Sequence, residues 1–402
     1  MTWHAVWRWS VLGVLTSPAA LRAQTFDSTF TRQVAPGVTH RRLVVNSVPW
    51  NINVVTVRLD TPGLAVQAAH AKDTFLGRET VAEIAARHQR DGEQVLAAIN
   101  ADFFQLSDGA PINNFVVEGN WWRGLRAWPT AAPSHSQFAL TQAGRPLIER
   151  FSWVGTVSSR RYPEFALDGL NAAPGADGVT LFTQRYGAST PRDSAGRVLF
   201  DVPLTPVGHP GDTVLFQVAD TVRSGGGSSL AGRAVLVGGA TARNRLVALG
   251  PPGTPVRFLA SVLPDRGKLA TLVGGLPRLV VHGKGIADTA LADAEGTNAN
   301  LRLRHPRSAI GFTRDSTTLL LVTVDGRQPG SAGMDLMELS QLMLTLGAFE
   351  AVNLDGGGST TLVVAGEVVN RPSDAGGPRT VGNALLVVQG PPPPPSRRPR
   401  PH

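Results

Sequence analysis

A strand-like run that ends in one aspartate and three glycines has the clearest chemical content in this sequence. Residues 351–364 read AVNLDGGGSTTLVV, so Asp355 directly precedes Gly356, Gly357 and Gly358. Glycine lets the backbone approach an anion closely, and successive N–H groups can form an anion-binding nest. Asp355 would place a carboxylate beside that nest. A glycine-rich turn in which Asp355 only caps the backbone is the alternative that the motif alone leaves open.

The residues after the glycines distinguish this run from a nucleotide-binding P-loop. The Lys-Ser/Thr pair that a P-loop requires is missing, and the next segment is strand-like and not helical. The hydroxyls of Ser359 and Thr360 directly follow the glycines instead. A second glycine run, at 225–227, lies among Ser and Ala and predicts only a flexible turn.

Further carboxylates and guanidinium groups stand at the ends of other predicted strands. AAINADFF places Asn100 and Asp102 after a buried strand, with the same Asn-x-Asp spacing as AVNLDGG. HPRSAIG puts Arg307 at a strand start, and TVDGRQ puts Asp325 and Arg327 in a turn. The planar fork of arginine matches the oxygens of a phosphodiester. Two alternatives remain. The repeated Asn-x-Asp spacing can be a coincidence, and Asp325 and Arg327 can belong to an ordinary Asp-Gly hairpin turn.

The composition is that of a protein with a packed core. The 402 residues are 42% hydrophobic and 17% charged, with a net charge of +8 and no cysteine. Lysine occurs only at Lys72, Lys268 and Lys284, and the many arginines are scattered along the chain. Nucleic-acid binding would need a clustered basic patch, so we expect no nucleic-acid partner.

The two ends of the chain predict an exported protein. Residues 1–23 have the layout of a secretory signal cleaved near Ala23, with a retained anchor as the alternative. No other segment is apolar and long enough to predict a stable membrane span. Residues 391–402 are rich in proline and arginine and predict a disordered tail. A periplasmic or secreted location follows as the expectation.

The elements that would position these groups predict an α/β (mixed α+β) fold with a mixed twisted sheet flanked by helices. Residues 24–90 predict a β-rich region packing on a main domain at 91–390, and 151–266 a variable β-rich insertion. Capping-box spacing, Thr80 with Glu83 and Asp335 with Glu338, marks the start of two helices. The second helix lies between two strands, which suggests a βαβ-type unit.

Several segments together resemble the phosphodiester glycosidase family. They are NADFF, PRSAIG, VDGRQ, NLDGGGSTTLVV, and VVNRPSD with the later GPRTVGNALLVV. The resemblance spans roughly residues 94–388 and is strongest from Gly274 onward. It implies an α/β domain and hydrolysis of a sugar joined through its anomeric carbon to a phosphodiester. The family often has Asn-Gly-Gly where this chain has Asn100-Ala101-Asp102, so Asp102 is an added carboxylate or a tolerated turn residue.

The implied reaction suggests a role for each group. We expect Asp355 to be the catalytic carboxylate that activates water or attacks directly, with Asp102 and Asp325 as competitors. The candidate substrate ligands are the guanidinium groups of Arg307, Arg327 and Arg379, the backbone of Gly356, Gly357 and Gly358, and the side chains of Asn100, Asn370, Ser359 and Thr360. His305 could act as an acid or base, or be structural.

The sequence assigns no cofactor. Asp102, Asp325 and Asp355 carry oxygen ligands of the type that hard divalent cations use, so a carboxylate-bound cation stays open. No His or Cys cluster has zinc spacing. Two other functions stay open as well. One is a glycoside hydrolase or transglycosylase acting on phosphate-free envelope polysaccharide, and the other is a non-catalytic secreted glycan-binding protein.

Overall fold

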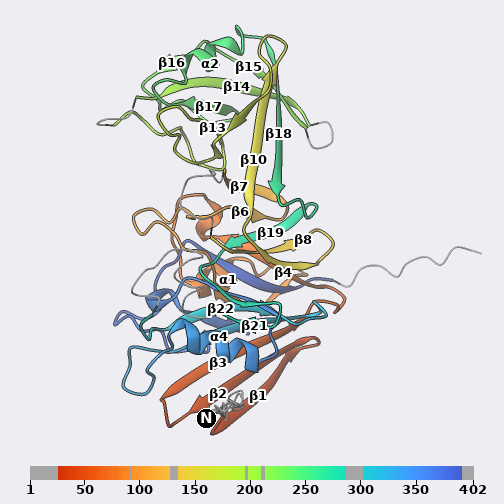
Figure 1. The fold of residues 1–402 in the computed structure, drawn as a ribbon, viewed down its shortest axis with the longest axis vertical. Helices are drawn as coiled ribbons and strands as arrows, with labels where there is room; N and C mark the ends of the chain where they lie inside the picture. The colour runs from red at the N-terminus through yellow and green to blue at the C-terminus, as the bar shows by residue number, and fades with distance from the viewer. Residues whose placement is uncertain are drawn as a thin grey trace, which may run out of the picture.

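The computed structural model describes residues 26–90, 92–126, 135–194, 198–209, 213–286 and 302–391. The predicted signal segment and residues 392–402 of the predicted tail lie outside these ranges. Two parts are visible in Figure 1: a lower body that contains both the first and the last strands, and an upper lobe formed by the middle of the chain.

The predicted α/β fold, a mixed sheet flanked by helices, is wrong. The structure is 48% strand and 9% helix. The described helices are α1 (Val81–Arg87), α2 (Arg243–Ala248) and α4 (Leu336–Thr345). Nearly all strand pairs are antiparallel, because short turns and not helices connect most successive strands. The apolar stripe in 336–346 does form a helix, α4. It is not part of an α/β fold, contrary to the expectation from the sequence.

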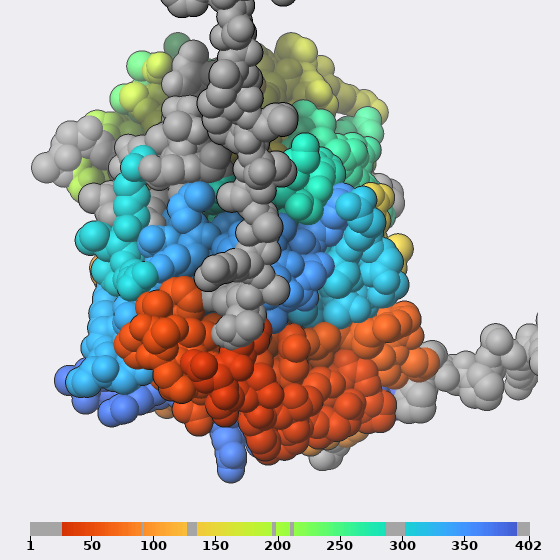
Figure 2. Space-filling view, turned by 60° about the horizontal axis from the view of Figure 1, so that its bottom comes forward, coloured from red at the N-terminus to blue at the C-terminus, as the bar shows by residue number. Residues whose placement is uncertain are grey.

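An eight-stranded sheet forms the centre of the lower body, in the order β1-β2-β3-β23-β22-β24-β20-β21. Its strands are β1 (Ser28–Ala35), β2 (Val38–Val45), β3 (Trp50–Arg58), β20 (Arg278–Val281), β21 (Lys284–Gly285), β22 (Arg307–Phe312), β23 (Thr318–Val324) and β24 (Glu350–Asn353). The N-terminal strands, red to orange in Figure 2, therefore lie directly beside the C-terminal third of the chain, in blue. This sheet carries several of the predicted site residues.

A five-stranded sheet, in the order β26-β25-β5-β27-β4, packs on the first. Its strands are β4 (Leu64–His70), β5 (Gln94–Asn100), β25 (Leu362–Val364), β26 (Glu367–Val368) and β27 (Asn383–Gln389). Alternation along β3 shows the layering. Val55 and Val57 enter the core between the two sheets, whereas Ile52 and Val54 enter a second core with α4. The far face of the five-stranded sheet packs on α1.

The remaining strands form a long sheet that runs from the body into the upper lobe, where residues 151–266 lie. Its strands are β6 (Phe115–Val117), β7 (Asn120–Leu125), β8 (Gln137–Thr141), β9 (Pro146–Glu149), β10 (Ser152–Ser159), β11 (Phe165–Leu167), β12 (Gly169–Leu170), β13 (Val179–Thr183), β14 (Phe200–Gly208), β15 (Thr213–Val218), β16 (Arg223–Ser224), β17 (Ala234–Gly238), β18 (Pro255–Leu263) and β19 (Leu269–Gly274). The lobe has its own core around Trp153 and Leu236.

Both predicted capping boxes are confirmed. The Thr80 side chain accepts from the Glu83 amide and Glu83 reaches back to Thr80 at the start of α1. Asp335 and Glu338 do the same at the start of α4. Each box satisfies backbone N–H groups that a helix start otherwise leaves unpaired. The capping fixes where α4 begins, and α4 covers the sheet that carries the candidate site.

Candidate functional site

Strand register brings three of the predicted site residues to one edge of the eight-stranded sheet. Arg307, the first residue of β22, pairs with Val324, the last residue of β23. The same strand pairs Ala309 with Asn353, the last residue of β24. The residues that follow β23 and β24 therefore emerge beside the start of β22. Asp325 and Asp355 lie in those two connections.

The five-stranded sheet reaches the same edge through Asn100, which ends β5. The side-chain Nδ2 of Asn100 donates to the backbone carbonyl of Asp355 at 2.6 Å, and its Oδ1 accepts from the Ser308 hydroxyl at 2.7 Å. The Asp355 amide in turn donates to the Ala101 carbonyl at 3.0 Å. Asn100 is only 1% exposed. It ties the two sheets together and positions Asp355, and its side chain does not face solvent.

The three glycines form a tight turn, the 3₁₀ segment η3 (Gly357–Ser359). Gly357 has φ +63, a conformation that favours glycine. Its amide donates to the Pro306 carbonyl, while the amides of Ser359 and Thr360 donate to carbonyls within the turn. In this structure those three amides are therefore occupied by backbone acceptors, and the predicted nest has fewer donors to offer a ligand.

Side chains, not amides, crowd the glycine turn. A Cβ on Gly357 would lie 3.2 Å from Nη2 of Arg327. A Cβ on Gly358 would overlap both Nη2 of Arg379 and Oδ1 of Asp374. The glycines thus let two guanidinium groups lie against the backbone next to Asp355. This close approach accounts for small residues at two successive positions.

Each of these guanidinium groups has a partner. Arg379 forms a two-point ion pair with Asp374, at 2.8 Å from Nε to Oδ2 and 3.2 Å from Nη2 to Oδ1. Arg327 is exposed, has φ +57, and approaches Nδ1 of His305 at 3.2 Å and 3.3 Å. Because arginine can only donate, His305 Nδ1 accepts here and the ring proton belongs on Nε2.

His305 is tuned towards its neutral form. Burial lowers its pKa, and the charges of Arg327 and Arg307 lower it further. Its Nε2 is buried with no hydrogen-bond partner among the described residues, as are the hydroxyls of Thr360 and Thr361. Buried polar atoms without partners are uncommon in folded proteins. Because they are buried, a ligand does not reach them in this conformation.

Burial raises the pKa of Asp355 to about 6. The Ser359 side chain, the Arg379 charge and the Gly356 amide each act in the opposite direction, lowering it. The residue as a whole is partly exposed, so a ligand can reach it. A carboxylate with a pKa near neutrality is suited to accept a proton from water or to attack a carbon.

The other two predicted carboxylates are held by the protein itself. Asp102 is 1% exposed and accepts from the Asn113 side chain at 2.6 Å, and burial raises its pKa to about 7. Asp325 is 6% exposed and accepts from the Arg371 amide at 2.9 Å and from Asn370 at 3.3 Å. Their hydrogen bonds brace the loops around the site.

Arg307 and Asn370 also face the protein. Arg307 is 4% exposed and donates to the carbonyls of Met334 and Leu303, and burial lowers its pKa to about 10. Asn370 accepts from the Leu362 amide at 2.7 Å and donates to the Thr360 carbonyl at 3.1 Å. Both secure the segments that carry the glycine turn.

No metal cluster is found in the part of the chain that the structure describes. No group of three His, Cys, Asp or Glu side chains is placed there to hold an ion. Asp102, Asp325 and Asp355 each have different protein partners. Nor does any described helix have the length and apolar character needed to cross a bilayer.

Comparisons with known proteins show which family this part of the chain matches. Residues 217–388 match the family model of phosphodiester glycosidases. The glycine turn, Arg327 and Arg379 lie within the matched residues. Those residues belong to the phosphodiester glycosidase family. The resemblance inferred from the motifs is thereby confirmed.

Two relatives and one solved structure show how far the similarity extends. The SPbeta prophage-derived uncharacterized protein YomE of Bacillus subtilis (strain 168) is 42% identical over 91 residues, covering 23% of this chain and 14% of that protein. N-acetylglucosamine-1-phosphodiester alpha-N-acetylglucosaminidase of Bos taurus is 32% identical over 120 residues, covering 28% and 22%. The chain thus spans less than a quarter of either relative's length.

A hypothetical protein from Synechocystis has a similar fold. The two structures superpose with a TM-score of 0.71 at 21% identity, over 90% of this chain and 64% of that one. At this identity the likeness extends to the fold alone. The site residues of the phosphodiester glycosidase domain here must therefore be argued from their own geometry.

Two features of this site escaped the sequence analysis. Asp374, in RPSDAGGPR, was not identified as a site residue, although it stands five residues before Arg379. His305 was left between a structural and a chemical role. The available sequence signal for Asp374 was that it and Arg379, of opposite charge, flank Gly376 and Gly377. For His305, only the three-dimensional structure reveals the contact with Arg327.

Gly358→Ala tests the close approach of Arg379 to the turn. The methyl group would displace the flexible guanidinium, so we expect the fold to hold while binding of inorganic phosphate weakens about tenfold. Gly376→Ala is the matched control, because a Cβ there meets nothing within 4 Å. Titration calorimetry measures both. Equal phosphate binding by the two variants would contradict this account of the glycines.

Proposed function

We propose that this protein is an exported hydrolase that cleaves the bond between the anomeric carbon of a sugar and a phosphodiester oxygen in a cell-surface or extracellular glycan. One observation carries the proposal: Asp355 lies next to a turn covered by Arg327 and Arg379, and burial raises the pKa of its carboxyl group. A carboxylate serves the sugar side of such a bond, and guanidinium groups serve the phosphate side.

In this mechanism the substrate phosphate lies against Arg327 and Arg379. As the bond between the anomeric carbon and oxygen breaks, its electron pair moves to the departing phosphate, and positive charge develops on the sugar. The guanidinium groups stabilise the negative charge of the phosphate. Because a phosphate is a weak base, it needs little protonation to depart.

Asp355 acts on the opposite side of the anomeric carbon. As a base it takes a proton from water, whose oxygen forms the new bond to carbon and inverts the configuration. As a nucleophile it bonds to the carbon first, and water then releases the sugar with retention. The configuration of the released sugar distinguishes these routes. Asp102 and Asp325 position the loops in either case, because their oxygens already accept protein hydrogen bonds.

Asp355→Asn tests the central role, and its effect on stability has a predictable sign. We expect hydrolysis of a glycosyl phosphodiester to fall at least about 1000-fold, as loss of a key catalytic group does. The folded protein holds a proton on Asp355 up to about pH 6, whereas the unfolded value is 3.8. Wild type therefore loses stability relative to the variant as the pH rises between these values.

Urea unfolding at two pH values measures this effect. We expect Asp355→Asn to be more stable than wild type by about 1–2 kcal/mol at pH 8, after allowing for solvent screening, and equal to it near pH 3. Asp315→Asn, an exposed control, should leave hydrolysis unchanged. Full hydrolysis by folded Asp355→Asn would remove Asp355 from the mechanism. A substrate panel that also contains phosphate-free disaccharides separates this function from plain glycoside hydrolysis.

The pH dependence of the rate follows from the same carboxylate. Because Asp355 must be ionised to act, kcat/KM should fall below about pH 6. The Arg379 charge lowers that pKa, so Arg379→Gln should move the acid limb to higher pH as well as slow the reaction. Rate profiles from pH 4 to pH 9 measure the shift. An acid limb at the same pH in both proteins would separate Arg379 from Asp355.

Export rests on residues 1–23, whose pattern is that of a secretory signal. Expression of the full chain in a Gram-negative host should release a product that lacks about 23 residues into the periplasm. Deletion of residues 2–23 should leave the product in the cytoplasm. Mass spectrometry of both fractions gives the cleavage position, and an uncleaved cytoplasmic product from the full chain would refute export.

A further inference from the structure

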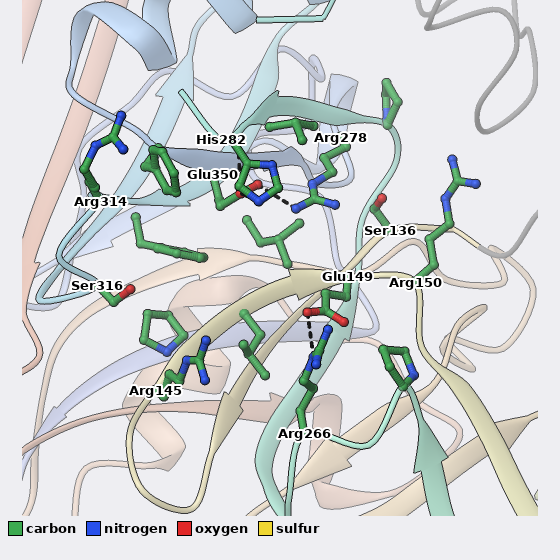
Figure 3. Close-up of a pocket in the computed structure, with 18 of the residues that line it drawn as sticks. Ser136, Arg145, Glu149, Arg150, Arg266, Arg278, His282, Arg314, Ser316 and Glu350 are labelled. Carbon is green, nitrogen blue, oxygen red and sulfur yellow. Dashed lines mark hydrogen bonds and ion pairs between the residues drawn. The ribbon is translucent and has the colours of Figure 1, made fainter. Parts of the chain in front are cut away.

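A concave surface lies away from the glycine turn. It is a groove of about 810 Å³ between the β8–β9 hairpin and the eight-stranded sheet. In Figure 3, Arg278, His282, Glu350 and Arg314 lie along one wall and Arg145, Glu149 and Arg266 along the other. We call this surface the arginine groove. Nothing in the mechanism above uses it.

The arginine groove carries a positive charge. It is lined by five arginines (Arg145, Arg150, Arg266, Arg278 and Arg314) and two glutamates (Glu149 and Glu350). The difference, five minus two, is a net charge of +3 with His282 neutral. Within a low-dielectric concave surface, charge of one sign concentrates the electric field and attracts the opposite sign. An anionic ligand is therefore favoured.

Arg278 is held in place for such a ligand. Its Nη2 donates to the carboxylate of Glu350 at 2.6 Å, and that carboxylate also accepts from the His282 amide at 3.0 Å. Glu350 is only 6% exposed, so it anchors the arginine from beneath. The other N–H groups of Arg278 have no acceptor among the described residues. A pre-oriented guanidinium loses less entropy on binding an anion.

The groove also offers flat apolar surface of the kind that sugar rings pack on. Phe349 lies in the wall, with the Arg314 guanidinium 4.3 Å from its ring centre and His282 edge-on to it at 5.7 Å. Pro264, which is exposed, adds a ring surface in the lining. Alternation of cationic groups and apolar rings suits a chain in which phosphates alternate with sugars or polyols.

Position links the groove to the glycine turn. Glu350, in the groove, is the first residue of β24, and Asp355 follows the end of the same strand. Five residues of extended chain span about 17 Å. A polymer of several units is long enough to contact both places at once.

We propose that the arginine groove binds an anionic, phosphodiester-linked glycan chain outside the bond that is cleaved. That the bound chain belongs to the substrate polymer rests on the proposed function, whereas binding itself does not. Duplex nucleic acid is the other common polyanion, but its sugar faces are not exposed for stacking on rings such as Phe349 and Pro264.

The experiment compares two double charge reversals. R145E/R314E alters the groove at two arginines whose guanidinium groups have no acceptor among the described residues. R233E/R257E removes the same charge at exposed positions of the upper lobe, outside the groove. Both pairs are made in the Asp355→Asn background, so that the probe is not hydrolysed during binding.

The probe is a fluorescein-labelled poly(glucosyl 1-phosphate), in which each sugar is joined through its anomeric carbon to a phosphodiester, and its binding is followed by fluorescence anisotropy. Loss of two guanidinium contacts, at roughly tenfold each, should raise the Kd for the probe about 100-fold in R145E/R314E. The Kd of the control variant R233E/R257E should change by no more than about twofold. Binding should weaken as NaCl rises, because salt screens exposed charges. Neutral dextran of equal length should bind poorly.

Two results would overturn the groove assignment: an equal loss of affinity in both double variants, or tighter binding of a duplex DNA of equal charge. A separate turnover measurement with Asp355 intact tests the link to hydrolysis. There the ratio of kcat/KM on the polymer to kcat/KM on a single-sugar phosphodiester should fall at least about tenfold in R145E/R314E. Groove binding without any hydrolysis would refute the proposed function and leave the groove assignment standing.

Discussion

The close approach of two guanidinium groups to a backbone without side chains is the constraint on which the rest of the site depends. Arg327 lies over Gly357 and Arg379 over Gly358, so a methyl group at either glycine would meet a guanidinium nitrogen. The adjacent carboxylate of Asp355 combines burial, which raises its pKa, with the Arg379 charge, which lowers it. The result is a carboxylate that ionises near neutrality and two cations beside it. Neither property would survive a looser turn, because both depend on short distances in a region of low dielectric.

Buried polar residues hold this arrangement where a hydrophobic core could not. Asn100 joins β5 to the Asp355 backbone, Asp102 holds Asn113, and Asp325 holds Asn370 and the Arg371 amide. A buried carboxylate is costly unless it is hydrogen-bonded, and each of these is. Such bonds are directional, whereas apolar contacts allow sliding. The loops after β23 and β24 therefore keep one geometry even though they lie at a sheet edge.

The sequence predicted where the strands begin and end better than which way the polar side chains there face. Strand ends at Arg307, Asp325 and Asp355, the capping boxes and the family were predicted correctly, because each depends on local spacing. The α/β class was wrong, because the pairing of β3 with β23, far apart in the chain, has no local signal. Arg307 and Asn370 were expected to bind substrate, but their side chains donate to backbone carbonyls. Which way a polar side chain faces is decided by tertiary packing, and alternation along a strand cannot reveal it for residues in loops.

The charge of the chain is easier to understand once the glycine turn and the arginine groove are both in view. A net charge of +8 made almost wholly of arginine suggested no function while the residues were scattered in sequence. In the fold, Arg327 and Arg379 gather at one end of β24, and Arg278, Arg314 and Arg145 gather near the other. Arginine suits both places, because its planar fork can keep one protein contact and still present further N–H groups to an anion. Lysine has three N–H donors but lacks this planar fork, so it cannot present two parallel N–H groups to an anion. The use of arginine therefore reads as a requirement of anion recognition at fixed geometry along one strand.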